Sequence, residues 1–179
     1  YKEKLNSLNK IEEIANNGGV GGVKIYRTPN GGGTVDIYIQ SLGYNKPTDN
    51  LVGLVQKEVD PLPYTGEGYG TAPIGHFVTI KPVETQVINI NTILELKPGF
   101  GIDDIQEYIN KAIEDYLQEL RESWQDEEYI VVRVAKIEAL ILDINGVVDI
   151  RETKINNLSQ NLNLDENIIP IRGDINAVV

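Results

Sequence analysis

A segment rich in glycine and proline, residues 61–75, limits most strongly how this chain can fold. Seven of its fifteen residues are of these two types: Pro61, Pro63, Gly66, Gly68, Gly70, Pro73 and Gly75. Neither a helix nor a strand tolerates that density, because proline removes a backbone donor and glycine favours turn conformations. The sequence therefore predicts a loop or linker here, between two stretches with regular apolar patterns.

The stretch before this loop predicts helices and a hairpin. Apolar residues recur every three to four positions in its first segment, which is the period of a helix. In later segments they alternate with polar residues, which is the period of a strand. Thr48 or Asp49 can cap a helix, and the Asn16–Gly19 turn can end one. The expected elements are a helix over 2–15, strands over 23–27 and 34–40, and a helix from about 49 to 59.

The stretch after the loop predicts strands followed by helices and strands again. A helix over 102–122 has the clearest pattern, and Asp103 and Asp104 lie in its first turn, where the helix dipole favours negative charge. Pro170 predicts that the last strand lies at a sheet edge or carries a bulge. The other expected elements are strands at 76–81, 87–96, 147–155 and from 168, and a helix at 133–142.

This order of elements lacks strict alternation of strand and helix, so it favours an α+β fold over a doubly wound sheet. We expect two small α/β sandwich modules, residues 1–82 and 83–179, with antiparallel or mixed sheets covered by helices. The charge differs between the same two modules. Residues 1–82 carry eight basic and eight acidic residues, whereas residues 83–179 carry eight basic and nineteen acidic residues. The resulting net charge of −11 would repel nucleic acid and anionic lipid.

The composition argues against most catalytic and metal chemistry. The chain has no cysteine and one histidine, His76, which excludes thiolate sites and histidine-rich metal sites. No run of about 18 apolar residues could span a membrane. We therefore expect no enzyme, no catalytic, cofactor-binding or metal-binding residues, and no cofactor. Because the chain lacks methionine even at position 1, we also expect it to be a fragment or a processed product.

Several short motifs could have a functional role, and each also has a structural explanation. Two glycine runs could cradle a phosphate, but neither precedes a helix. A hairpin turn is favoured for the first run, and a flexible connector that could pack on a neighbouring chain is favoured for the second. His76 could act as a general base, although no partner is evident. Asp103–Asp104 and Asp143–Gly146 could bind a cation, but helix ends explain them better, and Asp126–Glu128 is expected to be a solvated loop. The motifs are Gly31–Gly33, Gly66–Gly70, Asp103–Asp104, Asp126–Glu128 and Asp143–Gly146.

Aromatic residues give a further hint of protein contacts. Trp124 is the single tryptophan of the chain, and nine tyrosines accompany it. Tyrosine is enriched in interface cores, so a contact surface and partial burial within the fold are equally good readings. The tyrosines in question, in or beside loops or on a strand face, are Tyr38, Tyr44, Tyr64 and Tyr69.

A series of short segments, many of them rich in glycine or proline, follows a distinctive order. They are Val20–Tyr26, Asn30–Ile39, Val55–Pro61, Gly66–Gly68, Ala72–Gly75, Val78–Val83, Lys97–Phe100, Asn145–Asp149 and Ile169–Gly173. In order and spacing, from about residue 8 to residue 175, the chain resembles the baseplate J-like family of contractile phage tails. It is most similar to the version in prophages of Gram-positive bacteria, with extra residues in the loop before Ala72.

The resemblance implies a structural wedge subunit of a tail baseplate, assembled in the host bacterial cytoplasm and without transferable catalytic residues. It also implies a longer N-terminal chain, so that this sequence would be a C-terminal fragment. The expected partners are other wedge and tail proteins and adjacent copies in the ring, with no nucleic acid and no membrane. The isolated fragment is expected to be a monomer or a weak dimer.

Two other classes of function stay open at this point. One is a small-molecule-binding regulatory module, since paired α+β sandwiches can hold a ligand; the other is a hydrolase that uses carboxylates and His76. We further expect mild protease to cut first within 61–75 and to leave two folded pieces. The acidic residues 83–179 are expected to face a basic surface on a partner.

Overall fold

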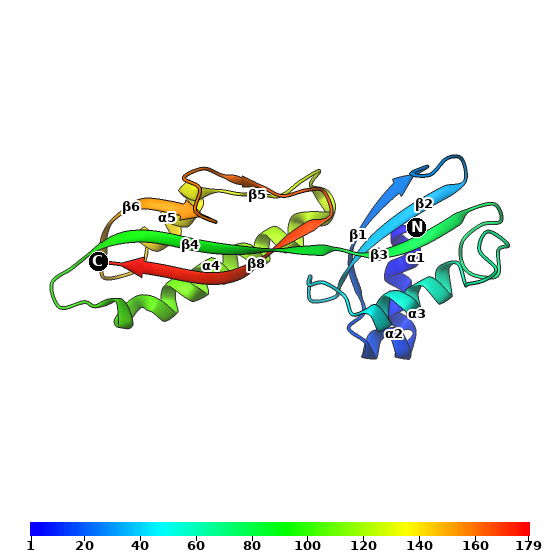
Figure 1. The fold of residues 1–179 in the computed structure, drawn as a ribbon. Coiled ribbons are helices and arrows are strands. Elements are labelled where there is room, and N and C mark those ends of the chain that lie inside the picture. Colours follow the sequence, from blue (N-terminus) through cyan, green and yellow to red (C-terminus); the bar gives the residue numbers. More distant parts are fainter. The chain divides into compact units, whose positions relative to one another are not determined.

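The computed structural model describes residues 1–179, and the chain divides into two compact units, Tyr1–Glu84 and Thr85–Val179 (Figure 1). Each unit combines helices with a small sheet, so the predicted α+β class is confirmed. None of the helices is both long and apolar enough to serve as a membrane span. The independent folding of the two units remains a prediction and is taken up in the Discussion.

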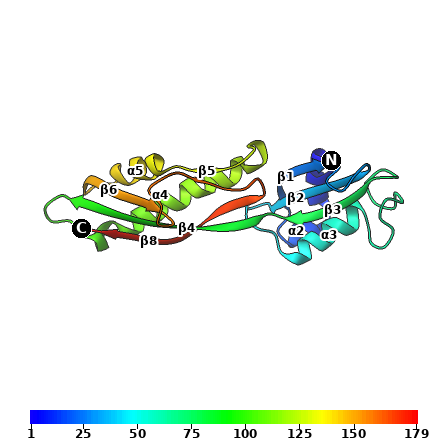
Figure 2. The same cartoon turned by 45° about the horizontal axis from the view of Figure 1, so that its top comes forward.

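The first unit packs helices against one face of a three-stranded sheet of order β1-β2-β3 (Figure 2). Strand β2 is antiparallel to β1 and parallel to β3. Val35, Ile37 and Ile39 of β2 point into the core, as their alternation predicts. The elements are α1 (Lys2–Ser7), the 3₁₀ helix η1 (Leu8–Lys10), α2 (Glu12–Asn16), β1 (Val20–Arg27), β2 (Thr34–Ser41), α3 (Asp49–Val59) and β3 (Phe77–Pro82).

The prediction of one helix over residues 2–15 is wrong, because the segment breaks into α1, η1 and α2. Ile11 has an extended backbone, with φ −80° and ψ 116°. Just before it, the Asn9 amide donates to the Val20 carbonyl at 2.8 Å and accepts from the Val20 N–H at 2.6 Å. The Asn9 side chain thus bonds to the backbone at the start of β1 as a neighbouring strand would. This contact competes with the continuation of the helix through residues 9–11.

The helix predicted from about residue 49 is confirmed as α3, and its N-terminus has the expected cap. The Thr48 hydroxyl accepts a hydrogen bond from the Leu51 N–H at 3.2 Å. This bond satisfies one of the backbone donors that every helix N-terminus leaves free. Leu51, Val55 and Val59 form the buried face of the helix.

The 61–75 segment is a loop, as predicted, but it lies within the first unit and does not link the two units. The buried Asp60 carboxylate accepts hydrogen bonds from the Gly66 N–H at 2.9 Å and the Val78 N–H at 2.8 Å. The Ala72 N–H donates to the Val59 carbonyl at 2.8 Å. These bonds tie the loop to the end of α3 and to the start of β3.

A protease cut in this loop should therefore not separate two folded pieces. We still expect the first cut within 61–75, because exposed loop tips are the preferred sites of nicking. The two fragments should stay together under native conditions, since β3 pairs with β2 along six residue pairs. Denaturing gels should show two bands while gel filtration shows an unchanged size. Separation of the fragments in native buffer would contradict the position of β3 in this sheet.

The second unit places two helices on one face of the sheet β6-β4-β8 (Figure 2). Strand β6 is antiparallel to β4. The Asn89 side chain accepts from the Asp174 N–H and the Asn91 side chain accepts from the Asn176 amide, and the shared order of these contacts indicates that β8 runs parallel to β4. The elements are β4 (Glu84–Leu96), α4 (Ile102–Ser123), η2 (Trp124–Asp126), β5 (Val131–Val132), α5 (Val134–Leu142), β6 (Val147–Ile155), β7 (Leu162–Asn163) and β8 (Ile168–Val178).

The long helix and the last strand are placed as predicted. Helix α4 extends one residue beyond the expected 102–122, and β8 lies at an edge of its sheet, where the missing N–H of Pro170 costs nothing. The sequence analysis missed β5 and β7, which pair with each other over two residues each. Strands this short leave too little alternation to detect.

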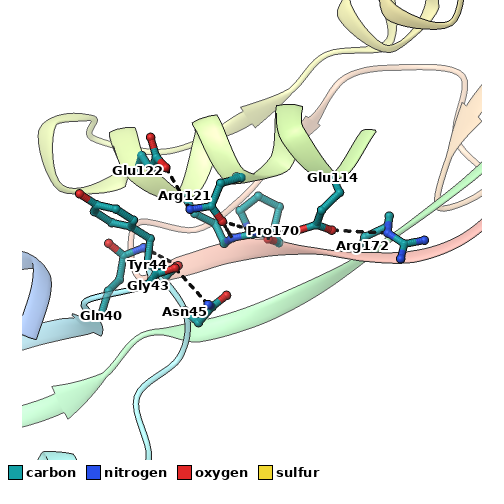
Figure 3. A network of polar contacts seen from close by, with 10 residues as sticks. Gln40, Gly43, Tyr44, Asn45, Glu114, Arg121, Glu122, Pro170 and Arg172 are labelled. Atoms are coloured by element: carbon teal, nitrogen blue, oxygen red, sulfur yellow. Dashed lines mark hydrogen bonds and ion pairs between the residues drawn. The ribbon is translucent and has the colours of Figure 1, made fainter. Parts of the chain in front are cut away.

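A buried arginine fastens α4 to β8 (Figure 3). The Arg121 guanidinium donates to the Pro170 carbonyl at 3.0 Å and to the Glu114 carboxylate at 2.6 Å, while its side chain is only 5% exposed. Glu114 also lies 3.4 Å from Arg172 of β8. The network therefore joins two elements that are far apart in the sequence.

Candidate interaction surfaces

The histidine considered as a general base belongs to a local structural contact. His76 Nδ1 lies 2.9 Å from the Tyr1 hydroxyl, and both residues line a cavity of about 450 Å³. Burial and the nearby Asp60 carboxylate raise the pKa of the Tyr1 phenol above 10.0, so the phenol stays protonated at neutral pH. This pair supplies one hydrogen bond between the two side chains, and no carboxylate hydrogen bond to orient the imidazole accompanies it.

The two glycine runs occupy turns, as the sequence predicts for the first of them. Gly31–Gly33 connects β1 to β2, and the Thr34 hydroxyl closes it by donating to the Gly31 carbonyl at 2.7 Å. Gly66–Gly70 lies in the loop held by Asp60. Both runs are followed by strands, so neither offers the converging amides of a helix N-terminus.

The acidic motifs have structural partners or face solvent. The Asp104 carboxylate accepts from the Gly101 N–H at 2.7 Å, which caps α4. Asp126 ends η2, Glu127 and Glu128 follow it, and all three residues are exposed. Asp143–Gly146 ends α5, where Gly146 has a φ of +106° and its Cα faces the Phe100 ring so closely that a Cβ would lie 2.4 Å from it. No three histidine, aspartate or glutamate side chains gather as metal ligands.

Some of the aromatic residues are buried within the fold, and others are exposed and available for protein contacts. Trp124 is fully buried, and its indole N–H donates to the Glu166 carbonyl at 2.9 Å, so it belongs to the core. Tyr38 and Tyr44 are half-buried. Tyr64 and Tyr69, by contrast, are 52% and 72% exposed, which leaves them available for contacts.

A groove on the second unit brings together two acidic motifs that the sequence kept separate. It has a volume of about 630 Å³ and lies between α4 and the end of α5. Its floor is apolar and is made by residues such as Ile105, Ala112, Leu140 and Ile144. Its rim carries carboxylates from both helices and one lysine, namely Asp104, Asp115, Asp143 and Lys111.

The charges around this groove favour a cationic contact. Lys111 is already paired with Asp115 at 2.5 Å, so it offsets one of the three carboxylates. Tyr108 lines the same groove and is 66% exposed, which offers an aromatic face to a cation. A lysine or arginine fits such a site because its aliphatic stem can cover the apolar floor while its charge stays at the rim.

Comparisons with known proteins identify both units. The model of the baseplate J-like central domain matches residues 11–82, and that of the baseplate J-like C-terminal domain matches residues 88–178. Two proteins of Bacillus subtilis (strain 168) are similar over 160 residues: the uncharacterized protein YqbT, 29% identical, and the phage-like element PBSX protein XkdT, 28% identical.

The alignment with each relative covers 89% of this chain and 44% of the relative, so the chain spans less than half of their length. The two domain models follow one another in the order central, then C-terminal, and together they cover nearly all of the chain. On this basis, the chain belongs to the baseplate J-like family.

Proposed function

We propose that this chain is a structural part of a phage-type tail baseplate, where it acts as a wedge subunit through protein contacts and not by catalysis. The observation that carries the proposal is the consecutive match of two baseplate J-like domains along the chain. The name of one relative, a phage-like element protein, supports the same setting. The local structural roles of His76 and of the acidic motifs also support a role without catalysis.

The proposal is tested on tail particles from the organism that encodes the chain. Antibodies raised against residues 1–179 should label the baseplate end of the tail in negative-stain electron microscopy. Pre-adsorption of the antibodies with the purified chain should abolish this label. Label along the sheath, or no label on intact particles, would contradict a place in the baseplate.

The second unit supplies the surface for one of these contacts. With eight basic and eighteen acidic residues, Thr85–Val179 has a net charge of −10, and the groove concentrates carboxylates over an apolar floor. Complementary charges on two protein surfaces speed their association and fix how the two surfaces align. The partner is therefore a basic surface of another baseplate protein or of an adjacent copy, with a lysine or arginine in the groove.

A double substitution of groove carboxylates tests this contact. Asp115→Asn with Asp143→Asn should weaken binding to the partner about tenfold and flatten its salt dependence, because close charge pairs contribute a few kcal/mol at interfaces. For the unsubstituted chain, affinity should fall as salt rises from about 0.05 to about 0.5 M, where screening shortens to a few Å. Titration calorimetry with the partner found among the tail proteins measures both effects.

The matched control replaces two exposed carboxylates outside the groove, Glu127→Gln and Glu128→Gln. It removes the same charge but leaves the groove intact, so the affinity should change little. Equal losses in both double variants would indicate a general charge effect. An affinity independent of salt would contradict an acidic docking face.

Metabolite binding is a second candidate, because the groove volume lies within the range of small-molecule sites. A thermal-shift screen with amino acids and nucleotides separates the two functions. A ligand that binds the folded state must raise the melting temperature. A rise that the groove substitutions abolish would favour the regulatory module over the assembly role.

A further inference from the structure

Three asparagine residues of the chain are each followed by glycine, and all three pairs lie in turns. Such a pair can react with itself, because glycine has no Cβ to hinder the approach of its backbone nitrogen to the asparagine side chain. In the folded chain, the reaction also requires that the side-chain amide and the turn are free to rearrange. The pairs are Asn17–Gly18, Asn30–Gly31 and Asn145–Gly146.

The fold holds the first pair by the asparagine side chain. The Asn17 amide donates to the Glu13 carbonyl at 2.7 Å and accepts from the Asn50 amide at 2.7 Å. The Gly18 N–H donates to the Ala15 carbonyl at 3.2 Å, at the end of α2. Both the side-chain carbon that would be attacked and the nitrogen that would attack it are therefore held in place.

The fold holds the third pair by its glycine. Gly146 is buried, and its Cα faces the Phe100 ring so closely that a Cβ would lie 2.4 Å from it. The Gly146 carbonyl accepts from the Lys97 N–H at 2.8 Å, and the Lys97 ammonium donates to the Asn145 side chain at 3.3 Å. Ring closure needs a rotation of the backbone at this pair, and these contacts oppose it.

The second pair lacks such restraints. Asn30 and Gly31 are both exposed in the turn between β1 and β2, and Asn30 forms its hydrogen bond through the backbone and not through its side chain. The Gly31 nitrogen lies 3.3 Å from the Thr28 carbonyl, at the long end of hydrogen-bond distances. Outside the neighbouring residues, no atom lies within 4 Å of the position that a Gly31 Cβ would take. Both reacting groups can therefore approach each other.

We propose that Asn30 is a site of spontaneous deamidation in the folded chain, and that the fold protects Asn17 and Asn145 from the same reaction. The Gly31 nitrogen bonds to the side-chain carbonyl carbon of Asn30, and the bond from this carbon to the amide nitrogen breaks. Ammonia leaves with the proton of the Gly31 nitrogen, and a succinimide ring remains. Water then opens the ring at either carbonyl and gives aspartate or isoaspartate, so that the reaction exchanges water for ammonia without oxidation or reduction.

The product changes the turn between β1 and β2. It adds a carboxylate there and, as isoaspartate, also a methylene group in the backbone. The Thr34 hydroxyl now accepts from the Asn30 N–H at 3.1 Å and donates to the Gly31 carbonyl at 2.7 Å. The added methylene lies between these two groups, so the hydroxyl cannot keep both bonds in their present geometry. This modification concerns the chain itself and does not depend on the proposed function.

Peptide mapping by mass spectrometry, after prolonged incubation of the folded chain in neutral buffer, measures the reaction at each site. Exchange of the amide for a carboxyl group adds about 1 Da, and chromatography separates aspartate from isoaspartate. Asn30 should convert at least about tenfold faster than Asn17 and Asn145, because exposed turns open locally at little cost in free energy. Similar rates at the three sites, or a faster reaction at either of the other two, would overturn the proposal.

The same incubation in concentrated guanidinium chloride separates the effect of the fold from that of the local sequence. In the unfolded chain the restraints on Asn17 and Asn145 are absent, so the three sites should convert at similar rates. If Asn30 kept its advantage in the unfolded chain, neighbouring residues and not the fold would determine the rates. That result would contradict protection by the fold.

A substitution at an exposed position tests the protection of Asn17 in the folded chain. Asn50→Ala removes the amide that donates to Asn17 but lies on the surface of α3, so the melting temperature should change little. Conversion at Asn17 should become about threefold faster, because its side chain loses one of two hydrogen bonds. The rate at Asn30 should stay the same and serves as the internal control. An unchanged rate at Asn17 would show that these hydrogen bonds do not protect it.

Discussion

Replacing Ile109 with alanine is expected to destabilise the second unit by about 2–5 kcal/mol, the usual cost of truncating a fully buried isoleucine. Ile109 lies on the buried face of α4 with Ile105 and Ile113, and its side chain is 0% exposed. Removing three carbons there leaves a cavity that neighbouring side chains fill only in part. The first unit should unfold as before, because it has a separate core.

Trp124 makes this prediction measurable. It is the single tryptophan of the chain and is fully buried in the second unit, so its fluorescence reports the unfolding of that unit. Urea titrations followed by fluorescence should show the Ile109→Ala transition at a much lower midpoint. Circular dichroism, which senses helices of both units, should show two transitions in this variant.

The matched control is Ile37→Ala in the first unit, where Ile37 is also 0% exposed. It should lower the transition of the first unit by a similar amount and leave the Trp124 fluorescence midpoint unchanged. Distant, independent sites do not affect one another's unfolding in this way. If Ile37→Ala moved the fluorescence midpoint as far as Ile109→Ala does, the proposal of two independently folding modules would be wrong.

Arg121→Ala is expected to destabilise the second unit by about 2–3 kcal/mol, because the buried Pro170 carbonyl loses its donor and the packing of a buried side chain is lost. The substitution removes the donor that the Pro170 carbonyl uses at 3.0 Å and leaves the Glu114 carboxylate without its closest cation. Arg121→Lys should recover only part of this loss, because an ammonium group cannot bond to both acceptors in the fork geometry of a guanidinium.

A second ion pair on the same helix provides the control. Lys111 and Asp115 lie 2.5 Å apart, but their side chains are 74% and 60% exposed. Lys111→Ala should therefore change stability by at most about 0.5 kcal/mol, as is usual for exposed i,i+4 pairs. Urea unfolding followed by Trp124 fluorescence compares the variants. Similar losses of unfolding free energy for Arg121→Ala and Lys111→Ala would show that burial does not determine how much Arg121 stabilises the second unit.

The sequence alone determined the elements whose signals are local. Helix α4 follows from its apolar stripe, and the start of α3 follows from the Thr48 cap, because both depend on residues within a few positions of one another. The edge position of β8 follows from Pro170, which lacks the N–H that a central strand needs. The order of glycine- and proline-containing segments was enough to suggest the family.

Tertiary structure decided the features that join distant parts of the chain. The break in the first helix depends on the contact between Asn9 and Val20, and the place of the 61–75 loop depends on the bonds from Asp60. The groove exists because α5 packs against α4, so that Asp143 and Asp104 line one cavity. Local periodicity cannot reveal such contacts, because it records which face of an element is apolar and not which distant residue meets it.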